Sequence, residues 1–237
     1  MPWDFVLILV VLGAVVPWRG AVRIRALLRQ EELSTAERLA LYASTIAFQW
    51  VAVAVILWRT GVHRIDMVAL GVTLPKFLLA GLIAVALLLP LLANQIFALR
   101  RLARLPPEQQ GVVGALARKL MPQNQVESLA FIALMATVAV CEELIYRGFV
   151  FTAFYAAFGD SLAAGIIASS LLFSFAHLYQ GPRGLFSTFV VGLLFASARA
   201  WSGSLAPCIV VHLLVDLVAG LAAPRMLRSG AVQERAA

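Results

Sequence analysis

Long apolar segments alternate with short, basic polar stretches along the chain. A helix needs roughly 20 residues to cross a hydrocarbon core of about 30 Å, and a shorter one is tolerated when its flanks reach the interface. By that measure the pattern predicts seven membrane-spanning helices, at residues 3–18, 39–58, 77–99, 126–146, 161–178, 185–201 and 204–222. We therefore expect an all-α, polytopic transmembrane bundle of seven or eight spans.

The eighth span would come from an apolar run at residues 148–158, which is too short to cross a bilayer alone. We interpret this run as a continuation of the preceding helix or as an interfacial segment. The first apolar segment has Asp4 before it and Trp18 and Arg19 after it. Because a secretory signal begins with basic residues and ends at small ones, we interpret this segment as a retained span.

The composition indicates that lipid is the main solvent of the chain. Hydrophobic residues make up 62% of the 237 residues, charged residues make up 13%, and the mean hydropathy is +0.92. The net charge of +7 does not predict a nucleic-acid partner, because the arginines flank apolar segments as membrane topology requires. Cys141 and Cys208 lie in apolar stretches, so we expect two buried thiols rather than a disulfide.

Basic residues concentrate in residues 19–38, in residues 100–125 and in the C-terminal tail, residues 223–237. The positive-inside rule places such stretches in the cytoplasm. With seven spans, the N-terminus is then outside the cell membrane and the tail is inside.

The distribution of charge predicts three parts of the chain. Residues 1–125 form N-terminal helices with basic loops, residues 126–222 form a core that carries the chemistry, and residues 223–237 form the basic tail. The second and third spans contain no charged residue, whereas the later apolar helices contain or adjoin Glu127, Glu142, Glu143, His177, Arg199, His212 and Asp216. Ionisable residues are costly inside a membrane and usually serve a function, so we expect the site among the C-terminal spans.

The first candidate motif is a pair of adjacent glutamates in the fourth span. Residues four apart on a helix lie on one face, so Glu143 and Arg147 are placed to form an ion pair. Glu142 points elsewhere, on the face of Tyr146, and stays available for proton transfer. The alternative is a helix end at which both glutamates are solvated.

Two histidine motifs follow. His177 ends the fifth span and shares a stripe with Ser170 and Ser174, which we interpret as packing residues because the chain contains no GxSxG motif. His212 and Asp216 are four residues apart and therefore share a helix face. Either histidine alone could serve only as a hydrogen-bonding group between helices.

Together these residues are the set that activation of a water molecule requires. Glu142 would take the proton from water, His177 would share or coordinate that water, and His212 with Asp216 would stabilise the developing oxyanion. Glu142, His177 and His212 could also supply the three protein ligands of a catalytic zinc ion. A zinc cofactor and a metal-free mechanism both stay open.

The strings EELIYRG, FSFAH and HLLVD, in this order, resemble the motifs EExxxR, FxxxH and Hxxx(N/D) of the CPBP family. This family contains CAAX prenyl proteases of the Ras-converting type and bacteriocin-processing or immunity proteins. The resemblance covers residues 126–220 and implies an intramembrane endopeptidase that cleaves a membrane-embedded or lipidated substrate. We expect an integral protein of a bacterial plasma (inner) membrane.

The resemblance also implies roles for individual residues. Glu142 matches the catalytic glutamate, with Glu143 and Arg147 as structural companions, and His177 matches the water-coordinating histidine. His212 and Asp216 fall on the motif of the oxyanion site, where the prenyl-protease branch usually has asparagine in place of aspartate. An ionised aspartate cannot donate a hydrogen bond, so we expect Asp216 to orient His212 or to favour a metal.

The side of the membrane on which the site opens raises a question about the substrate. In the predicted topology Glu142 lies near the non-cytoplasmic end of its span, whereas a prenyl protease should open towards the cytosol. Either the number of spans is off by one or the substrate differs. A non-catalytic immunity or scaffold protein and a proton-coupled transporter are the alternative functions.

Overall fold

The computed structural model describes residues 1–30 and 32–234, with side chains described except at residue 107 and from residue 223 onward. Within these residues there is no strand, and every regular element is a helix. The longer elements are α1 (Trp3–Val10), α2 (Val16–Arg29), α3 (Thr35–Val62), α4 (Phe77–Ala103), α5 (Gly111–Leu120), α6 (Gln125–Glu142), α7 (Phe151–Ala157), α8 (Leu162–Ala176), α9 (Gly181–Ser202) and α10 (Ala206–Glu234). The short elements are η1 (Val11–Val15), η2 (Pro107–Gln109), η3 (Glu143–Val150) and η4 (Leu178–Gln180). The predicted all-α class is confirmed.

Five helices are long and apolar enough to cross a membrane: Trp3–Arg29, Thr35–Val62, Phe77–Ala103, Gln125–Ala157 and Leu178–Ser202. Two shorter apolar helices, Leu162–Ala176 and Ala206–Ala222, complete the set. Each of the seven predicted apolar segments is therefore helical. Large apolar side chains such as Phe77 and Leu78, 81% and 80% exposed, face outward and suit lipid.

The first helix is longer than expected. The sequence predicted a span that ends at residue 18 and a loop from residue 19, but α1, η1 and α2 form one helix that continues to Arg29. Arginine and leucine are good helix formers, and nothing in this stretch breaks a helix. Pro17 removes one backbone donor inside the helix, and the chain accommodates it with the wider turn of η1 just before it.

The segment 148–158 continues the preceding helix almost to its end, as the first of the two interpretations predicted. α6, η3 and α7 run without interruption from Gln125 to Ala157. The helix stops where Gly159 and Asp160 adopt positive φ angles of 65° and 61°. Ser161 then caps α8 by accepting a hydrogen bond from the backbone N–H of Ala164.

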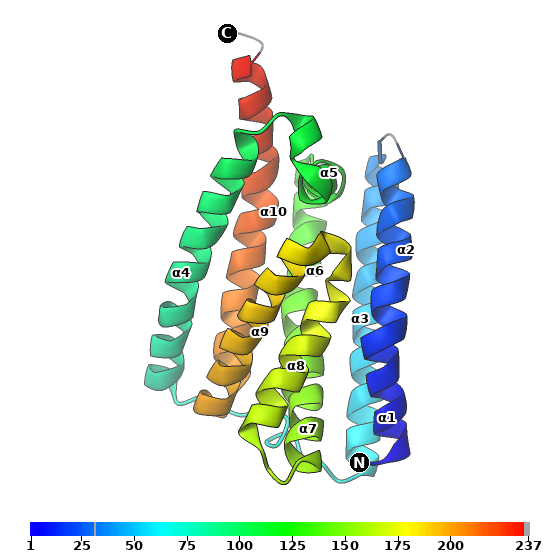
Figure 1. Ribbon diagram of the computed structural model, residues 1–237, viewed down its shortest axis with the longest axis vertical. Coiled ribbons are helices and arrows are strands. Elements are labelled where there is room, and N and C mark those ends of the chain that lie inside the picture. Colours follow the sequence, from blue (N-terminus) through cyan, green and yellow to red (C-terminus); the bar gives the residue numbers. More distant parts are fainter. Residues whose placement is uncertain (31, 235–237) are drawn as a thin grey trace.

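The helices are arranged in more than one layer (Figure 1). The pair α2 and α3 stands on one side and the pair α4 and α10 on the other, while α6 and the antiparallel hairpin of α8 and α9 lie between them. α3 packs on α6, and α10 packs on both α4 and α6. The turn between α8 and α9 stops short of the upper ends of α3 and α10, so His177 at this turn lies within the height of the bundle.

The two basic stretches of the N-terminal half lie at the same end of the bundle. The C-terminal turns of α2, the C-terminal end of α4 and the whole of α5 are at the top of Figure 1. This arrangement fits the positive-inside rule with the upper end in the cytoplasm. α10 also rises to this end, but the basic side chains of the predicted tail, residues 223–237, lie outside the described residues.

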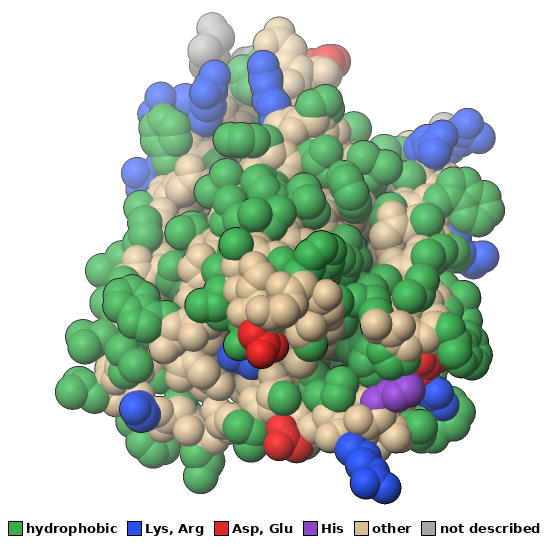
Figure 2. Space-filling view, turned by 60° about the horizontal axis from the view of Figure 1, so that its bottom comes forward, with side chains coloured by type: hydrophobic (Ala, Val, Ile, Leu, Met, Phe, Trp, Pro, Cys, Tyr) green, Lys and Arg blue, Asp and Glu red, His purple; other side chains and the backbone are tan. Residues whose placement is uncertain are grey.

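The opposite end carries a smaller polar cluster. Figure 2 brings this end forward and shows acidic, basic and histidine side chains among apolar ones in its lower part. Asp4 accepts from Arg59 at 2.6 Å and contacts His63 at 2.9 Å, which ties the start of α1 to the end of α3. From the sequence, Asp4 could be described only as a residue that flanks the first apolar segment, because its partners are 55 or more residues away.

Candidate active site

The two adjacent glutamates lie in the middle of the helix Gln125–Ala157, where the backbone changes from an α-helix to a π-helix. Glu142 ends α6, and Glu143 begins the π-helical stretch η3. Wider π-helical turns occur frequently at functional sites in proteins. Fully buried Arg147 and the apolar side chains of Phe149 and Val150 follow on the same stretch, so the glutamates sit on a rigid, solvent-excluded support.

Glu143 contacts two basic side chains rather than one. Its Oε1 atom lies 3.1 Å from Nη1 of Arg147, which is the ion pair that the helical spacing predicted. The same oxygen lies 2.9 Å from Nδ1 of His212, a contact between helices that the sequence did not predict. Glu143 and Arg147 are both 0% exposed, so this pair is enclosed by protein. Glu143 therefore connects the first motif to the third.

Arg147 is held by aromatic rings as well as by Glu143. Its guanidinium carbon lies 4.1 Å from the ring centre of Phe173 and 5.3 Å from that of Phe195. Cation–π contacts of this kind stabilise a buried guanidinium that has few hydrogen-bond acceptors. Phe173 comes from α8 and Phe195 from α9, so Arg147 also fixes the α8–α9 hairpin against η3.

His212 is surrounded by carboxylates. A carboxylate can only accept a hydrogen bond, so the Nδ1 contact with Glu143 places a proton on Nδ1. On the other side of the ring, Nε2 lies 3.3 Å from Oδ2 of Asp216 and 3.9 Å from Oε2 of Glu142. The spacing of His212 and Asp216 thus places both on one helix face, as predicted, and Glu142 faces the same ring nitrogen.

Glu142 has one bonded oxygen and one unbonded oxygen. Its Oε1 atom accepts a hydrogen bond of 3.2 Å from Nε2 of Gln49 on α3. Its Oε2 atom is buried and has no hydrogen-bond partner among the described residues. Buried polar atoms in proteins are nearly always paired, so this oxygen, like Oε2 of Glu143, is an exception among the described residues.

His177 lines the same cavity, and no hydrogen bond joins its Nε2 atom to another described residue. It caps the C-terminal end of α8, and its Nδ1 atom lies 2.8 Å from the backbone carbonyl of Phe173. A carbonyl only accepts, so Nδ1 carries the proton and the Nε2 lone pair stays available in the neutral ring. Ser170 and Ser174 instead donate to the backbone carbonyls of Ile166 and Leu185, at 2.6 and 2.7 Å, in agreement with a packing role.

A cavity of about 570 Å³ brings the predicted residues together. Its walls include all four residues predicted to act in catalysis: Glu142, His177, His212 and Asp216. The volume lies within the usual range of binding sites for small molecules. Arg23 of α2 and Leu120 of α5 also line the cavity, so it extends towards the basic end of the bundle.

The position of Glu142 along its helix differs from the predicted one. The sequence placed Glu142 near the non-cytoplasmic end of its span because the span was expected to end at residue 146. The helix continues to Ala157. Glu142 therefore lies close to midway between the two ends of this helix, and the membrane side to which the site opens stays a prediction.

The predicted zinc set stays a prediction. In the part of the chain that the structure describes, no three His, Cys, Asp or Glu side chains are arranged to hold a metal ion. Glu142, His177 and His212 line one cavity but do not fit a zinc site as they are placed. The steps proposed below therefore use protein groups alone.

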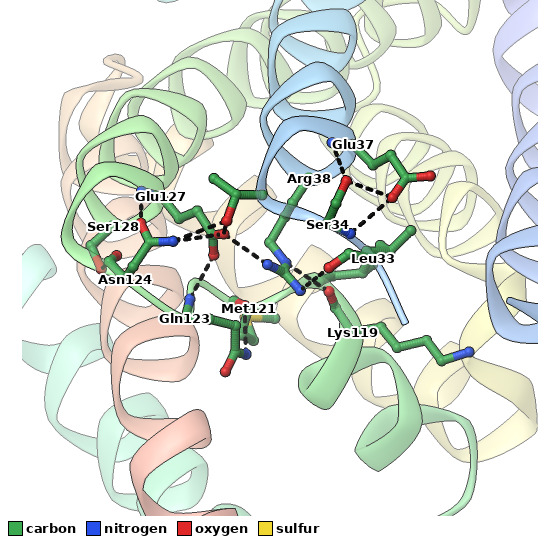
Figure 3. Close-up of polar contacts among 12 residues, drawn as sticks. Leu33, Ser34, Glu37, Arg38, Lys119, Met121, Gln123, Asn124, Glu127 and Ser128 are labelled. Carbon is green, nitrogen blue, oxygen red and sulfur yellow. Dashed lines mark hydrogen bonds and ion pairs between the residues drawn. The ribbon is translucent and has the colours of Figure 1, made fainter. Parts of the chain in front are cut away.

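Sequence reasoning missed a second buried carboxylate cluster, around Glu127 at the start of α6 (Figure 3). Its Oε1 atom accepts from Arg38 at 2.8 Å, from Thr35 at 2.7 Å and from Asn124 at 2.9 Å, and its Oε2 atom accepts from the backbone N–H of Gln123 at 2.7 Å. Arg38 had been assigned to a cytoplasmic loop, but it is only 6% exposed. This cluster joins α3 to α6 above the cavity.

Gln49 was also missed. It lies in the second predicted span, which was described as free of charge, and an uncharged amide carries no ionisable signal. The available signal was a polar pair, because Thr45 and Gln49 are four residues apart in an otherwise apolar span and both line the cavity. Polar residues inside a span usually face other protein groups, so this pair could have been assigned to the interior.

Residues 124–218 match a family model described as type II CAAX prenyl endopeptidase Rce1-like. No curated protein and no solved structure matches the chain. The matched segment is less than half of the chain, but it runs from the loop before α6 into α10 and contains all three motifs. The match agrees with the resemblance that the three motifs indicated: residues 124–218 of this chain are similar to the type II CAAX prenyl endopeptidase family.

Proposed function

We propose that this protein is an intramembrane endopeptidase in which Glu142 activates a water molecule to hydrolyse a peptide bond. The observation that carries the proposal is the pair of Glu142 Oε2 and His212 Nε2, which face each other at 3.9 Å on the wall of the cavity. The carboxylate oxygen is buried and has no hydrogen-bond partner among the described residues, as a poised general base requires.

The chemical steps follow from the groups on the cavity wall. Glu142 Oε2 takes a proton from water, and the Nε2 lone pair of His177 accepts the second hydrogen bond of that water. The resulting hydroxide attacks the peptide carbonyl carbon and forms a tetrahedral intermediate. Glu142 then returns its proton to the departing amine as the C–N bond breaks, so the peptide and one water become an acid and an amine.

His212 is the group best placed to stabilise the negative charge that forms on the carbonyl oxygen. When its ring carries both protons, Nε2 donates to the oxyanion while Nδ1 stays bonded to Glu143. Asp216, at 3.3 Å from the same Nε2, orients the ring and balances its charge. An ionised Asp216 donates nothing to the oxyanion itself.

The substrate we propose is a membrane-associated peptide or protein, including prenylated ones. The description of the matching family names prenyl endopeptidases, and the cavity walls carry apolar side chains from α2, α4 and α9, such as Ile24, Leu91 and Val191. We further propose that the protein resides in a bacterial plasma membrane with the cavity on the cytoplasmic side, where the basic end of the bundle lies.

The test uses the purified chain in lipid nanodiscs with fluorogenic peptides, each offered with and without a prenyl group. Cleavage by the wild type that is lost in Glu142→Gln supports the proposal, and equal cleavage by both proteins contradicts it. Loss of activity in chelator with recovery in added zinc would favour the zinc version of the mechanism. If no peptide is cleaved and Glu142→Gln keeps the cellular phenotype, a non-catalytic immunity or scaffold role is favoured.

A further inference from the structure

Gln49 is the point at which the N-terminal helices touch the proposed base. It lies on α3, outside the segment that matches the protease family, and its amide Nε2 donates to Oε1 of Glu142 over 3.2 Å. The two residues are 93 positions apart in sequence. No motif of the C-terminal core predicts this contact.

This contact gives the two oxygens of the Glu142 carboxylate different surroundings. Gln49 occupies Oε1, while Oε2 is left buried and unbonded within 3.9 Å of Nε2 of His212. A carboxylate on a long side chain rotates easily about its last bond. A fixed donor on one oxygen restricts that rotation and keeps the other oxygen directed at the histidine.

We propose that Gln49 is a positioning residue for the reaction proposed above, because it holds the Glu142 carboxylate so that Oε2 receives the proton of the attacking water. The inference rests on the proposed function. It assigns part of the active-site geometry to α3, which forms the wall of the cavity opposite α4.

A simpler role for Gln49 is to hold α3 against α6, since interhelical hydrogen bonds stabilise the association of helices in membranes. Such a role would change the stability of the fold but not the rate of the chemical step. The test must therefore separate catalysis from folding.

The variant Gln49→Met keeps the length of the side chain and removes the donor. Gln95→Met is the matched control, because Gln95 on α4 is also half-buried and lines the same cavity, but no hydrogen bond joins it to Glu142 in the described structure. Both variants are purified in nanodiscs, and their melting temperatures and steady-state kinetics on a cleaved peptide are compared with the wild type.

We expect kcat of Gln49→Met to fall by roughly 10- to 100-fold with KM nearly unchanged, because a misdirected base slows the chemical step without weakening binding. Gln95→Met can change KM, because Gln95 lines the cavity, but its effect on kcat should be several-fold smaller than that of Gln49→Met, since no hydrogen bond joins it to Glu142 in the described structure. If Gln49→Met and Gln95→Met have the same kcat, or if only KM changes, the inference is wrong.

A second measurement does not depend on cleavage. Infrared difference spectra of protein labelled with ¹³C-glutamate report the carboxylate bands, and the band that disappears in Glu142→Gln belongs to Glu142. That band should shift in Gln49→Met and stay in place in Gln95→Met. An unshifted band contradicts the inference, whereas a shifted band in a protein that cleaves no peptide contradicts only the proposed function.

Discussion

One continuous helix, Gln125–Ala157, carries buried carboxylates in two environments that differ in how completely their oxygens are paired. Glu127, at its start, is 0% exposed, and both of its oxygens accept hydrogen bonds. Glu142 and Glu143, near its middle, each keep one buried oxygen that has no partner among the described residues. We call the first environment saturated, because every carboxylate oxygen in it accepts a hydrogen bond, and the second unsaturated, because some of its carboxylate oxygens do not.

The difference separates a structural carboxylate from a chemical one. Burying a polar group is costly unless it is paired, so a carboxylate that serves only the fold should end with every oxygen bonded. Glu127 meets that condition with donors from two parts of the chain, Arg38 on α3 and the adjacent residues Gln123 and Asn124 before α6. An unpaired oxygen persists only where its surroundings hold it, as Gln49 and the neighbouring helices hold Glu142.

The largest effect on this comparison should come from Glu142→Gln. The amide keeps the size of the side chain but cannot take a proton from water, so kcat should fall by about 10²- to 10⁴-fold. The melting temperature should change little, because Oε2 has no partner to lose. Peptide cleavage and thermal unfolding in the same nanodisc preparation check both statements, and a large loss of stability with retained kcat would reverse the assignment of the two environments.

Arg38→Met should have the opposite profile. It leaves Glu127 buried without its counter-ion, so the free energy of unfolding should fall by about 3–5 kcal/mol. The double variant Arg38→Met with Glu127→Met should recover part of this loss, because no buried charge remains. Arg29→Met is the control, since Arg29 is exposed at the end of α2.

Activity per folded molecule is the second readout for these variants. It should stay close to that of the wild type in Arg38→Met at a temperature where the protein is folded, because Glu127 lies at the other end of α6 from Glu142. A selective loss of kcat at unchanged stability would show that the Glu127 cluster acts on the active site.

The sequence predicted the parts of this comparison that depend on helix geometry alone. Hydropathy located all seven apolar helices, and the spacing of four residues placed Glu143 beside Arg147 and His212 beside Asp216. The ends of helices were less predictable, because a stretch rich in arginine and leucine, which are good helix formers, continues the first helix to Arg29 without a break.

The contacts between distant helices were out of reach of the sequence. Gln49 with Glu142, Arg38 with Glu127 and His212 with Glu143 are separated by 93, 89 and 69 residues. Tertiary packing sets such pairs, and a single sequence contains no periodicity that relates one helix to another. The saturation of Glu127 and the incomplete pairing of Glu142 were therefore visible only in the structure.

Arg147→Lys tests the environment of Glu142 and Glu143, where the ion pair of Glu143 and Arg147 is as buried as the Arg38–Glu127 pair. Lysine can still reach Glu143, but it lacks the planar group that lies over the ring of Phe173. We expect the free energy of unfolding to fall by about 2 kcal/mol, the size of a desolvated cation–π contact. Chemical or thermal unfolding in detergent measures it, and exposed Arg19→Lys should be neutral; equal stability of both variants would contradict a structural role for the Phe173 contact.

The smallest effect should come from Asp216→Asn, at the exposed edge of the unsaturated environment. The side chain of Asp216 is 34% exposed, and its contact with Nε2 of His212 is 3.3 Å, whereas Nδ1 of His212 keeps its contact with buried Glu143. Loss of one such hydrogen bond costs about 1 kcal/mol, so kcat should change by roughly fivefold and stability hardly at all.

The direction of that change distinguishes two roles for Asp216. If the aspartate only orients His212, the variant should lose a little activity, because the amide holds the ring less firmly. If the position contacts the oxyanion, activity should rise, because the asparagine amide can donate a hydrogen bond where the ionised aspartate cannot. A loss of 100-fold or more would fit neither role and would favour Asp216 as a ligand of a metal ion, which zinc titration of the variant and the wild type would then measure directly.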